Sequence, residues 1–491
     1  MGLEIACDAF DEPAFASFAD RLREDLDALR LLCARPGFGR GPTTIGAELE
    51  LHLVDSAGRP SLLSRAVLAD TVGPKCTLEI DRFNLELNTE PLVLSAHAFT
   101  DLGTQLDSGL AEMRRAAASH GLRVVAIGIL PTLEEPDLQS SALTDNHRYR
   151  ALSSGIRRLR HEPFDIAIDG IDSLHMTSDD VALEGANTSF QVHLRVDPER
   201  FAQAYNAAQI ASGPVLAACG NSPLFLQRRL WDETRIALFR QSVDHRADVS
   251  MNDWRPARVS FGHGWVRHDA VELFEESVLL YEPLLPVVSD ESPIDVVRRG
   301  GVPELAEMRM HQGTVWRWNR AVYDSAAGGH FRIEYRSLPS GPTVADMIAN
   351  AAFILGLTLA LLPEADDLVT EITFGQVRRN FYEAARLGLD AELLWPSGTT
   401  PSPRAIPAPE LVRMLLPLAR EALVDAGVDR GEATRHLGVI AQRVDRGVTG
   451  ARWQRATFET LAAQFSPCDA ARAMLEAYEE KSLEGDPVGE W

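Results

Sequence analysis

Four segments of the sequence alternate apolar residues with acids, histidine, glutamine or arginine, in the two-residue period of a β-strand. Successive side chains of a strand point to opposite faces, so polar residues two positions apart share a face. The polar sets are Glu48, Glu50 and His52 in 45–53; Glu79, Asp81, Glu86 and Glu90 in 78–91; Gln191, His193 and Arg195 in 187–196; and Arg332, Glu334 and Arg336 around 331–335. Taken singly, each segment fits an ordinary strand with one face in water.

The residue types in these sets favour a shared site that binds metal ions and phosphate. If one sheet carries all four polar faces, the carboxylates repel one another unless cations lie between them. Carboxylate oxygens with one imidazole suit Mg²⁺ or Mn²⁺, whereas zinc prefers cysteine or several histidines. Interleaved arginines can bind phosphate or carboxylate groups through two hydrogen bonds. Together these groups predict phosphoryl transfer from a nucleotide, assisted by metal ions.

Composition and charge exclude several other kinds of protein. The 491 residues carry a formal net charge of −23, and the only lysines are Lys75 and Lys481. Neither lysine follows a glycine-rich loop, so a Walker-type phosphate loop is excluded, and a lysine Schiff base has almost no candidate. Binding to a nucleic-acid backbone needs a basic surface, which this charge balance does not predict. We therefore expect small-molecule partners, no nucleic acid and no membrane.

The elements that must position these residues mix strands and helices without a βαβ repeat, which predicts an α+β fold with a largely antiparallel, twisted sheet. The patterns predict a helix over 14–34 and nearly continuous helix from about 343 onward. The apolar run 347–362 is short for a membrane span and contains Asn350, so we expect a buried core helix. The Pro-, Ser- and Thr-rich segment 396–409 is the predicted linker. The expected regions are an N-terminal helix in 1–40, a catalytic domain in 41–365 and a helical C-terminal region in 366–491.

The N-terminus does not resemble a secretion signal, and the cysteines do not have the spacing of a zinc ribbon. Residues Met1–Pro13 are acidic and lack the basic and apolar regions of a secretion signal, so we expect a cytoplasmic protein. The five cysteines are scattered and never closely spaced, so their spacing does not predict a zinc ribbon, a redox pair or a disulfide framework. The sequence makes no prediction of oligomeric state.

Five short motifs resemble, by sequence and order, those of family-two glutamate–cysteine ligases, the carboxylate–amine ligases of the glutamine-synthetase-like superfamily. They are Ile45–Leu51 (IGAELEL), Asp81 with Leu85–Pro91 (LELNTEP), Gln191–His193 (QVH), Asn221–Pro223 (NSP) and Arg332–Arg336 (RIEYR). Each motif alone is weak, whereas four strands in the order of the family and with compatible spacing are fairly specific. The resemblance covers roughly 41–365.

The resemblance implies a sheet-lined funnel in which the γ-phosphate of ATP moves to a carboxylate, after which an amine attacks the acyl phosphate to form an amide. The residues that it implies as ligands of two or three Mg²⁺ ions, with Mn²⁺ as the alternative metal, are Glu48, Glu50, Glu86, His193 and Glu334. It implies catalytic roles for Arg336, which would stabilise the moving phosphoryl group, and for Glu334. The accessory residues for nucleotide and metal binding are Gln191, Asp81 and Arg332.

The substrates implied are glutamate and cysteine, so the activity would be that of glutamate–cysteine ligase, which makes γ-glutamylcysteine for glutathione biosynthesis. The residues proposed to bind substrate, without a ranking, are Arg235, Arg240, Trp316 and Arg317. A different amine acceptor is the first alternative. A non-catalytic nucleotide- or amino-acid-binding protein with this fold is the second, and a metal-dependent hydrolase is the third.

Two local features depart from a simple strand pattern. Glu79 and Asp81 fall on the opposite face from Glu86 if 78–91 is one straight strand. A bend at 82–84 would bring them together, and without it Asp81 is not a ligand. The segment Asn146–Tyr149 is predicted to be a solvated helix end.

Overall fold

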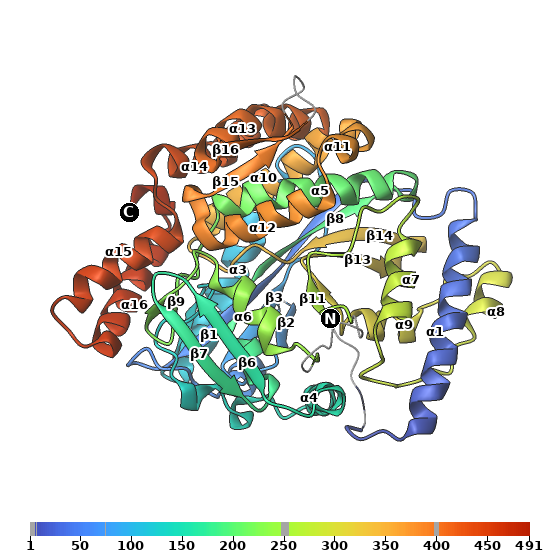
Figure 1. Cartoon of the computed structure of the whole chain (residues 1–491), viewed down its shortest axis with the longest axis horizontal. Helices are drawn as coiled ribbons and strands as arrows, with labels where there is room; N and C mark the ends of the chain where they lie inside the picture. Colours follow the sequence, from blue (N-terminus) through green and yellow to red (C-terminus); the bar gives the residue numbers. More distant parts are fainter. Residues whose placement is uncertain (1–4, 6, 74, 247–254, 397–401) are drawn as a thin grey trace.

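An eight-stranded sheet forms the centre of the protein (Figure 1). The computed structural model describes residues 5, 7–73, 75–246, 255–396 and 402–491. Six strands follow one another in the order β13-β14-β8-β1-β3-β2, and β4 and β5 each pair with β1, all antiparallel. The strands are β1 Thr44–Val54, β2 Lys75–Leu78, β3 Asn84–Asn88, β4 Leu92–Val93, β5 Arg123–Val125, β8 Phe190–Val196, β13 Asn319–Asp324 and β14 His330–Tyr335. The predicted α+β class with an antiparallel sheet is confirmed.

One face of this sheet is apolar and packs against three helices. These are α3 (Ala98–Ser119), α5 (Phe201–Ala217) and α10 (Val344–Leu361). Leu87 of β3 lies directly against α3 at Gly109, where an added Cβ atom would come within 2.5 Å of the leucine side chain. Phe331 of β14 meets Phe201 of α5, with ring centroids 5.7 Å apart. Because the apolar residues of each strand face these helices, the alternate polar residues must share the opposite face.

Helix α10 is the central helix of the core. Every residue from Asp346 to Thr358 is buried, and the helix packs against α5 and α13 (Ala408–Asp425). Among helices in the described part of the chain, Val344–Glu371 is the one long and apolar enough to cross a membrane, and 78 % of its apolar window is buried inside the protein. The apolar run around 347–362 therefore forms a core helix, as the sequence predicts.

The C-terminal region is mainly helical and shares the core of the sheet domain. Its helices are α11 Ala365–Glu371, α12 Phe374–Leu387, α13, α14 Arg430–Arg446, α15 Gly450–Ala462 and α16 Pro467–Glu484. A buried ion pair of 2.7 Å joins Arg443 of α14 to Asp346 of α10. Part of the predicted linker, 397–401, lies outside the described residues, and its described part contains β16 and the start of α13.

The remaining elements connect or flank the sheet. They are the helices α2 Ser64–Ala69, α4 His147–Leu159 and α6 Thr234–Ser242; the hairpins β6 Phe164–Asp169 with β7 Ser173–Ser178, β9 Leu224–Phe225 with β10 Arg228–Arg229, and β15 Glu392–Trp395 with β16 Arg404–Pro407; and the parallel pair β11 Val259–Ser260 with β12 Trp316–Arg317. One short 3₁₀ helix, η3 (Val181–Ala186), precedes β8 and borders the polar face of the sheet.

The N-terminal helix α1 (Glu12–Cys33) packs on the flank of the molecule against three helices, as Figure 1 shows. These are α7 Val271–Leu280, α8 Pro293–Arg298 and α9 Ala306–Gln312. Asp25 of α1 is buried in this contact, and its Oδ2 accepts a hydrogen bond of 2.9 Å from the backbone N–H of Met308. Burial, with the nearby Glu307 adding to it, raises the pKa of Asp25 from 3.8 to about 7.

We expect Asp25→Asn to stabilise the protein at high pH and to leave its stability unchanged near pH 4. The raised pKa means that the folded state favours protonated Asp25, so protonation of Asp25 stabilises the fold. This contribution to the free energy of unfolding is complete below pH 3.8 and is lost as pH rises through about 7. The variant should therefore gain about 2–4 kcal/mol in the free energy of unfolding at about pH 8. Urea denaturation at several pH values measures the gain. Asp27→Asn, at an exposed position of the same helix, is the control, and a pH-independent gain would contradict the prediction.

Candidate active site

The strand register brings the predicted acids and the histidine onto one face of the sheet. Glu50 of β1 lies opposite Glu86 of β3, and Glu48 lies opposite Gln191 of β8. On the other side of β8, His193 lies opposite Glu334 of β14. Because directly paired residues of antiparallel strands share a face, these side chains form one continuous polar surface across four strands.

A hairpin between β2 and β3 adds Glu79 to this surface. The segment predicted around 78–91 is not one strand: β2 ends at Leu78 and β3 begins at Asn84, so the chain turns between them, close to the bend considered at 82–84. Glu50, Glu79 and Glu86 each place a carboxylate oxygen within 4.8 Å of the others. We refer to these three residues as the carboxylate trio.

The trio is held by hydrogen bonds and crowded by like charge. Gln191 Nε2 donates to Glu50 at 2.8 Å, and Thr77 Oγ1 donates to Glu86 at 3.0 Å. Burial raises the pKa of Glu50, with Glu86 adding to it and Arg336 opposing it. Burial, together with Glu86 and Glu50, raises the pKa of Glu79 well above its ordinary value. Burial and like charge therefore favour the protonated forms of Glu50 and Glu79, and a bound cation would favour their ionised forms.

Glu48, His193 and Glu334 form a second group beside the trio. His193 Nε2 lies 3.1 Å from Glu48 Oε1, and Arg320 of β13 binds Glu334 through two hydrogen bonds of 3.0 and 2.9 Å. Burial opposes ionisation of Glu48, but His193 outweighs it and lowers the pKa to about 2. For Glu334, burial is likewise outweighed by Arg320 and Arg336, so its pKa lies well below its ordinary value. Both carboxylates are therefore ionised at neutral pH.

Arg336 connects the two groups. Its Nη1 donates to the side-chain oxygen of Gln191 and to Glu334. Burial would lower the pKa of Arg336, but Glu334 and Glu50 outweigh burial and raise it, so the guanidinium stays charged. A fixed cation between two groups of acids is well placed to bind an anionic group, such as a phosphoryl oxygen.

The structure does not bring two of the predicted accessory residues into these groups. Asp81 is fully buried against Gly185 of η3, and neither of its carboxylate oxygens has a hydrogen-bond partner among the described residues. Arg332 shares the face of Arg336, but it lies nearer the start of β14 and forms an ion pair with Asp324. Asp81 and Arg332 thus stand apart from the carboxylate trio.

The four substrate-binding candidates are also dispersed. Arg235 is buried, pairs with Glu233 at 2.9 Å and donates to the backbone oxygen of Arg336 at 3.4 Å, so it lies next to the site. Arg317 is buried in an ion pair of 2.7 Å with Glu276. Trp316 packs on Phe239, with centroids 5.8 Å apart, and the Arg240 guanidinium lies over the ring of Tyr382 at 5.5 Å. Of the four, Arg235 is the one that contacts a predicted catalytic residue.

Three site residues were not found as site residues by reasoning from sequence. A straight-strand count places Glu79 on the opposite face, whereas the hairpin resets the alternation of faces. Arg320 lies in a segment dominated by Trp316 and Trp318, which obscures its strand pattern. Glu184 lies in η3, where no strand period exists to reveal it, yet it borders the same cavity as Glu50 and Glu79.

The helix end predicted at Asn146–Tyr149 is confirmed as an element, because Asn146 caps α4 through a hydrogen bond from the N–H of Arg148. It is not simply a solvated end, however. The Tyr149 hydroxyl donates to the backbone oxygen of Leu78 at 3.1 Å, next to the hairpin that carries Glu79. Burial raises the pKa of Tyr149 well above its ordinary value, with Glu79 adding to it, so Tyr149 is a neutral hydrogen-bond donor that supports the hairpin.

The curled antiparallel sheet, which carries acids, histidines and arginines on one face, has the glutamine-synthetase-like fold. The chain belongs to glutamate–cysteine ligase family 2, whose model matches residues 44–467. This family consists of ATP-dependent carboxylate–amine ligases, so the protein is an ATP-binding ligase that acts on small molecules. The family match extends past residue 365, while the predicted domain boundaries and the cytoplasmic location stay predictions.

One of three solved structures that resemble this chain supports the fold, and the other two are more distant. Glutamate–cysteine ligase (GshA) from Francisella tularensis in complex with AMP matches with a TM-score of 0.55 and 11 % identity, over 90 % of this chain and 89 % of that chain. A bifunctional glutathione synthetase from Pasteurella multocida matches with a TM-score of 0.46 and 10 % identity, over 95 % and 55 %. The ligase PafA in complex with Pup matches with a TM-score of 0.36 and 12 % identity, over 85 % and 68 %. A search of curated proteins finds no match.

Proposed function

We propose that the protein is a glutamate–cysteine ligase, which joins the γ-carboxylate of glutamate to the amine of cysteine with consumption of ATP. The observation that carries the proposal is the placement of Arg336 between two groups of carboxylates on one sheet face. In the proposed reaction the γ-carboxylate takes the γ-phosphoryl group of ATP, and the cysteine amine then displaces phosphate. The products are γ-glutamylcysteine, ADP and phosphate, and γ-glutamylcysteine is the precursor used in glutathione biosynthesis.

The donor atoms of the two groups fit Mg²⁺ or Mn²⁺. The trio offers carboxylate oxygens alone, and the second group adds one imidazole, which suits hard cations rather than zinc. Glu50, Glu79 and Glu86 would hold one ion, and Glu48, His193 and Glu334 would hold another. Bound ions would neutralise the charge of the triphosphate and of the substrate carboxylate.

Residues of the chain supply positioning and fixed charge. Arg336 can exchange its bond to Gln191 for one to a phosphoryl oxygen, because that amide is a neutral partner. Arg320 keeps Glu334 ionised and in place through two hydrogen bonds. Arg235 donates to the backbone oxygens of Ser337 and Arg336, at 3.2 and 3.4 Å, and so fixes the backbone that carries Arg336. Such pre-organised charge lowers the barrier without reorganisation during the reaction.

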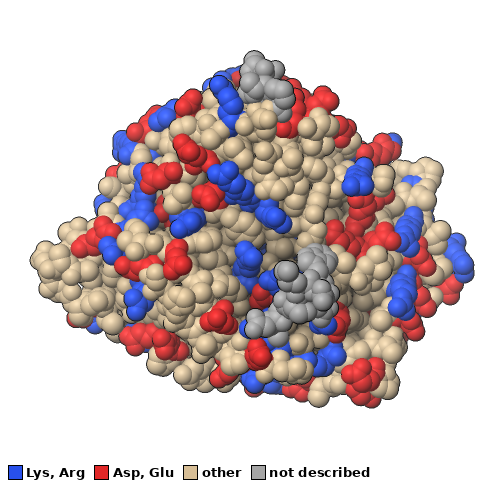
Figure 2. Space-filling model, viewed as in Figure 1, with Lys and Arg blue, Asp and Glu red and all other residues tan. Residues whose placement is uncertain are grey.

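The surface agrees with small, charged substrates rather than with one large polyanion. In Figure 2, acidic and basic side chains are interspersed over the visible face, and no broad basic area covers it. The arginines that concern the site instead lie beside acids, with Arg235 buried and Arg336 largely buried. Such arginines select a small anionic group by geometry.

Phosphate release with ATP, Mg²⁺ and glutamate, plus one amine at a time, tests the proposal. We expect release that depends on cysteine and on glutamate together, and γ-glutamylcysteine as the product by mass spectrometry. Release with a different amino acid, a peptide or a polyamine would instead assign a different acceptor to the same chemistry. No release with any amine, but protection by ATP and Mg²⁺ against thermal unfolding, would favour a binding protein.

A further inference from the structure

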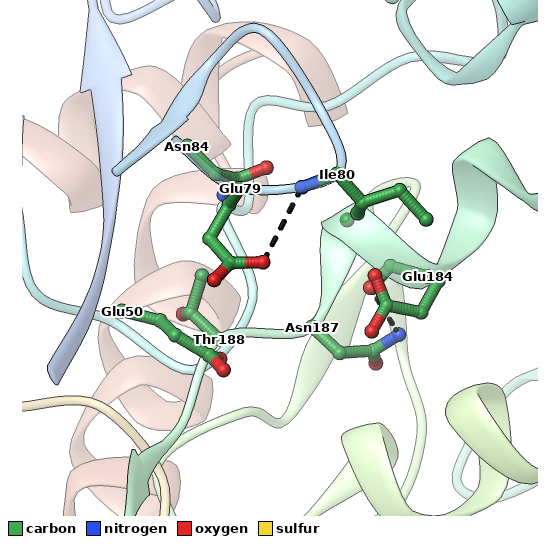
Figure 3. A pocket seen from close by; sticks show the side chains of 8 residues that line it. Glu50, Glu79, Ile80, Asn84, Glu184, Asn187 and Thr188 are labelled. Carbon is green, nitrogen blue, oxygen red and sulfur yellow. Dashed lines mark hydrogen bonds between the residues drawn. The ribbon is translucent and has the colours of Figure 1, made fainter. Parts of the chain in front are cut away.

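A small cavity lies beside the carboxylate trio and is lined by a fourth glutamate. Glu50, Glu79 and Glu184 border it together with Asn84, Asn187 and Thr188. Figure 3 shows the carboxylates of Glu79 and Glu184 approaching this space from opposite sides, with Glu50 below them. Glu86, the third member of the trio, does not line it. The cavity is therefore next to the trio and shares two of its acids.

A chain of hydrogen bonds fixes the orientation of Asn84 in this cavity. The Thr188 hydroxyl donates to the backbone oxygen of Ile127, so it can only accept from His52 Nε2, which lies 3.3 Å away. His52 Nδ1 is then an acceptor, and it receives a hydrogen bond of 3.2 Å from Asn84 Nδ2. Burial lowers the pKa of His52 to about 3, in agreement with this neutral tautomer. The amide of Asn84 thus turns its Oδ1 away from His52.

The Oδ1 atom of Asn84 is left without a donor. Asn84 is only 2 % exposed, and its Oδ1 has no hydrogen-bond partner among the described residues. Asn187 repeats the pattern, because its Nδ2 donates to the backbone oxygens of Leu183 and Glu184 while its buried Oδ1 has no partner in the described chain. Buried amide oxygens are normally satisfied, so two unsatisfied ones around one cavity indicate a missing cation or donor.

The charges around the cavity favour a cation in addition to the one at the trio. The trio and Glu184 carry four negative charges when ionised, and one divalent ion at the trio neutralises two of them. Asp81 adds a further buried carboxyl behind Glu184, because its Oδ2 lies against Gly185. Arg336 offsets part of the charge of Glu50 but already pairs with Glu334. Buried charge of one sign needs compensation, and an all-oxygen cavity suits Mg²⁺ or Mn²⁺.

We propose that Glu79, Glu184 and the Asn84 Oδ1 atom, with Glu50 shared, hold a further divalent cation, next to the ion of the carboxylate trio and separate from the ion at Glu48, His193 and Glu334. The inference rests on the proposed function, because it takes the trio as the first ion site. His52 is a positioning residue for this site, since it orients the amide of Asn84. The acid Glu184 is thereby a metal ligand supplied by η3 rather than by the sheet.

Titration of the full-length protein with Mn²⁺, without nucleotide, tests the inference. Free Mn²⁺ is followed by electron paramagnetic resonance for the wild type, Glu184→Gln and Glu86→Gln. Glu184→Gln should lose one ion per chain, or weaken one class of site at least about tenfold, and Glu86→Gln should weaken a different class. Glu364→Gln, at an exposed acid between α10 and α11, is the control and should bind as the wild type does.

Thermal unfolding adds a readout that does not depend on turnover. In metal-free buffer, Glu184→Gln should be at least as stable as the wild type, because it removes one of several crowded buried acids. Its gain in Tm on addition of Mn²⁺ should be smaller than that of the wild type. Unchanged Mn²⁺ binding in Glu184→Gln, with weaker binding in Glu86→Gln, would overturn this inference and leave the trio intact. Unchanged binding in both variants, or none in the wild type, would overturn the trio as well.

Discussion

Glu48→Gln should form ADP about a thousandfold more slowly than the wild type, with little loss of stability. Glu48 contacts His193 at 3.1 Å and forms no other ion pair among the described residues, so an isosteric amide preserves the packing. The substitution removes the negative charge that makes Glu48 an ion ligand. Phosphate release and ADP formation with saturating ATP, Mg²⁺, glutamate and cysteine measure the loss.

Replacement of Glu48 tests the role of the second group in activity more directly than replacement of Glu334 does. Glu334→Gln would leave Arg320 and Arg336 without their carboxylate, and breaking a buried ion pair in this way costs about 3–5 kcal/mol of stability. A loss of activity in that variant would therefore mix chemistry with unfolding. For Glu48→Gln, urea denaturation should show a change of less than about 2 kcal/mol. Turnover within tenfold of the wild type would remove Glu48 from the ion site.

The faces of the strands were predictable from sequence, because alternation depends only on the two-residue period. Glu48 and Glu50, Gln191 and His193, and Glu334 with Arg336 all lie on the predicted polar face. The chemistry of that face could then be predicted from the residue types alone. The period says nothing, however, of how far along a strand the site lies.

Arg332 shows the consequence of that missing information. It shares a face and a strand with Arg336, but the register places it opposite Arg195, where it pairs with Asp324 instead of with the site acids. Register depends on contacts between strands that are distant in sequence, so one strand pattern cannot provide it. For the same reason, the sequence could not show that Arg317 forms an ion pair with Glu276, or that Arg235 donates a hydrogen bond to the backbone after β14.

Glu79 and Glu184 illustrate a second limit. The alternation of faces holds within a strand and is reset by every turn. Because of the hairpin after Leu78, Glu79 lies on the polar face, whereas alternation along one straight strand places it on the other face. Glu184 belongs to a 3₁₀ helix whose position depends on packing, including the close approach of Gly185 to Asp81. Both acids enter the site through irregular backbone, which carries no periodic signal.

Arg336→Lys should lower kcat by about a hundredfold to a thousandfold and change KM for ATP much less. One guanidinium nitrogen of Arg336, Nη1, donates to both Gln191 and Glu334, and the planar fork also presents Nη2 and Nε, which a lysine ammonium lacks. The charge is retained, and Glu334 keeps its two hydrogen bonds from Arg320, so the fold should persist. A group that acts mainly on the moving phosphoryl group affects the transition state more than the bound substrate, which predicts the separation of kcat from KM.

Arg123→Lys provides the matched control, because Arg123 also lies on this sheet and binds a carboxylate, that of Glu479, through two hydrogen bonds of 3.0 Å. Steady-state kinetics of both variants should show a large loss of kcat for Arg336→Lys and a change of less than about twofold for Arg123→Lys. Equal kcat in the two variants would mean that the guanidinium of Arg336 only holds Gln191 and Glu334 in place. In that case the transferring phosphoryl group would have to be stabilised by the ions of the two carboxylate groups, without a direct contact from Arg336.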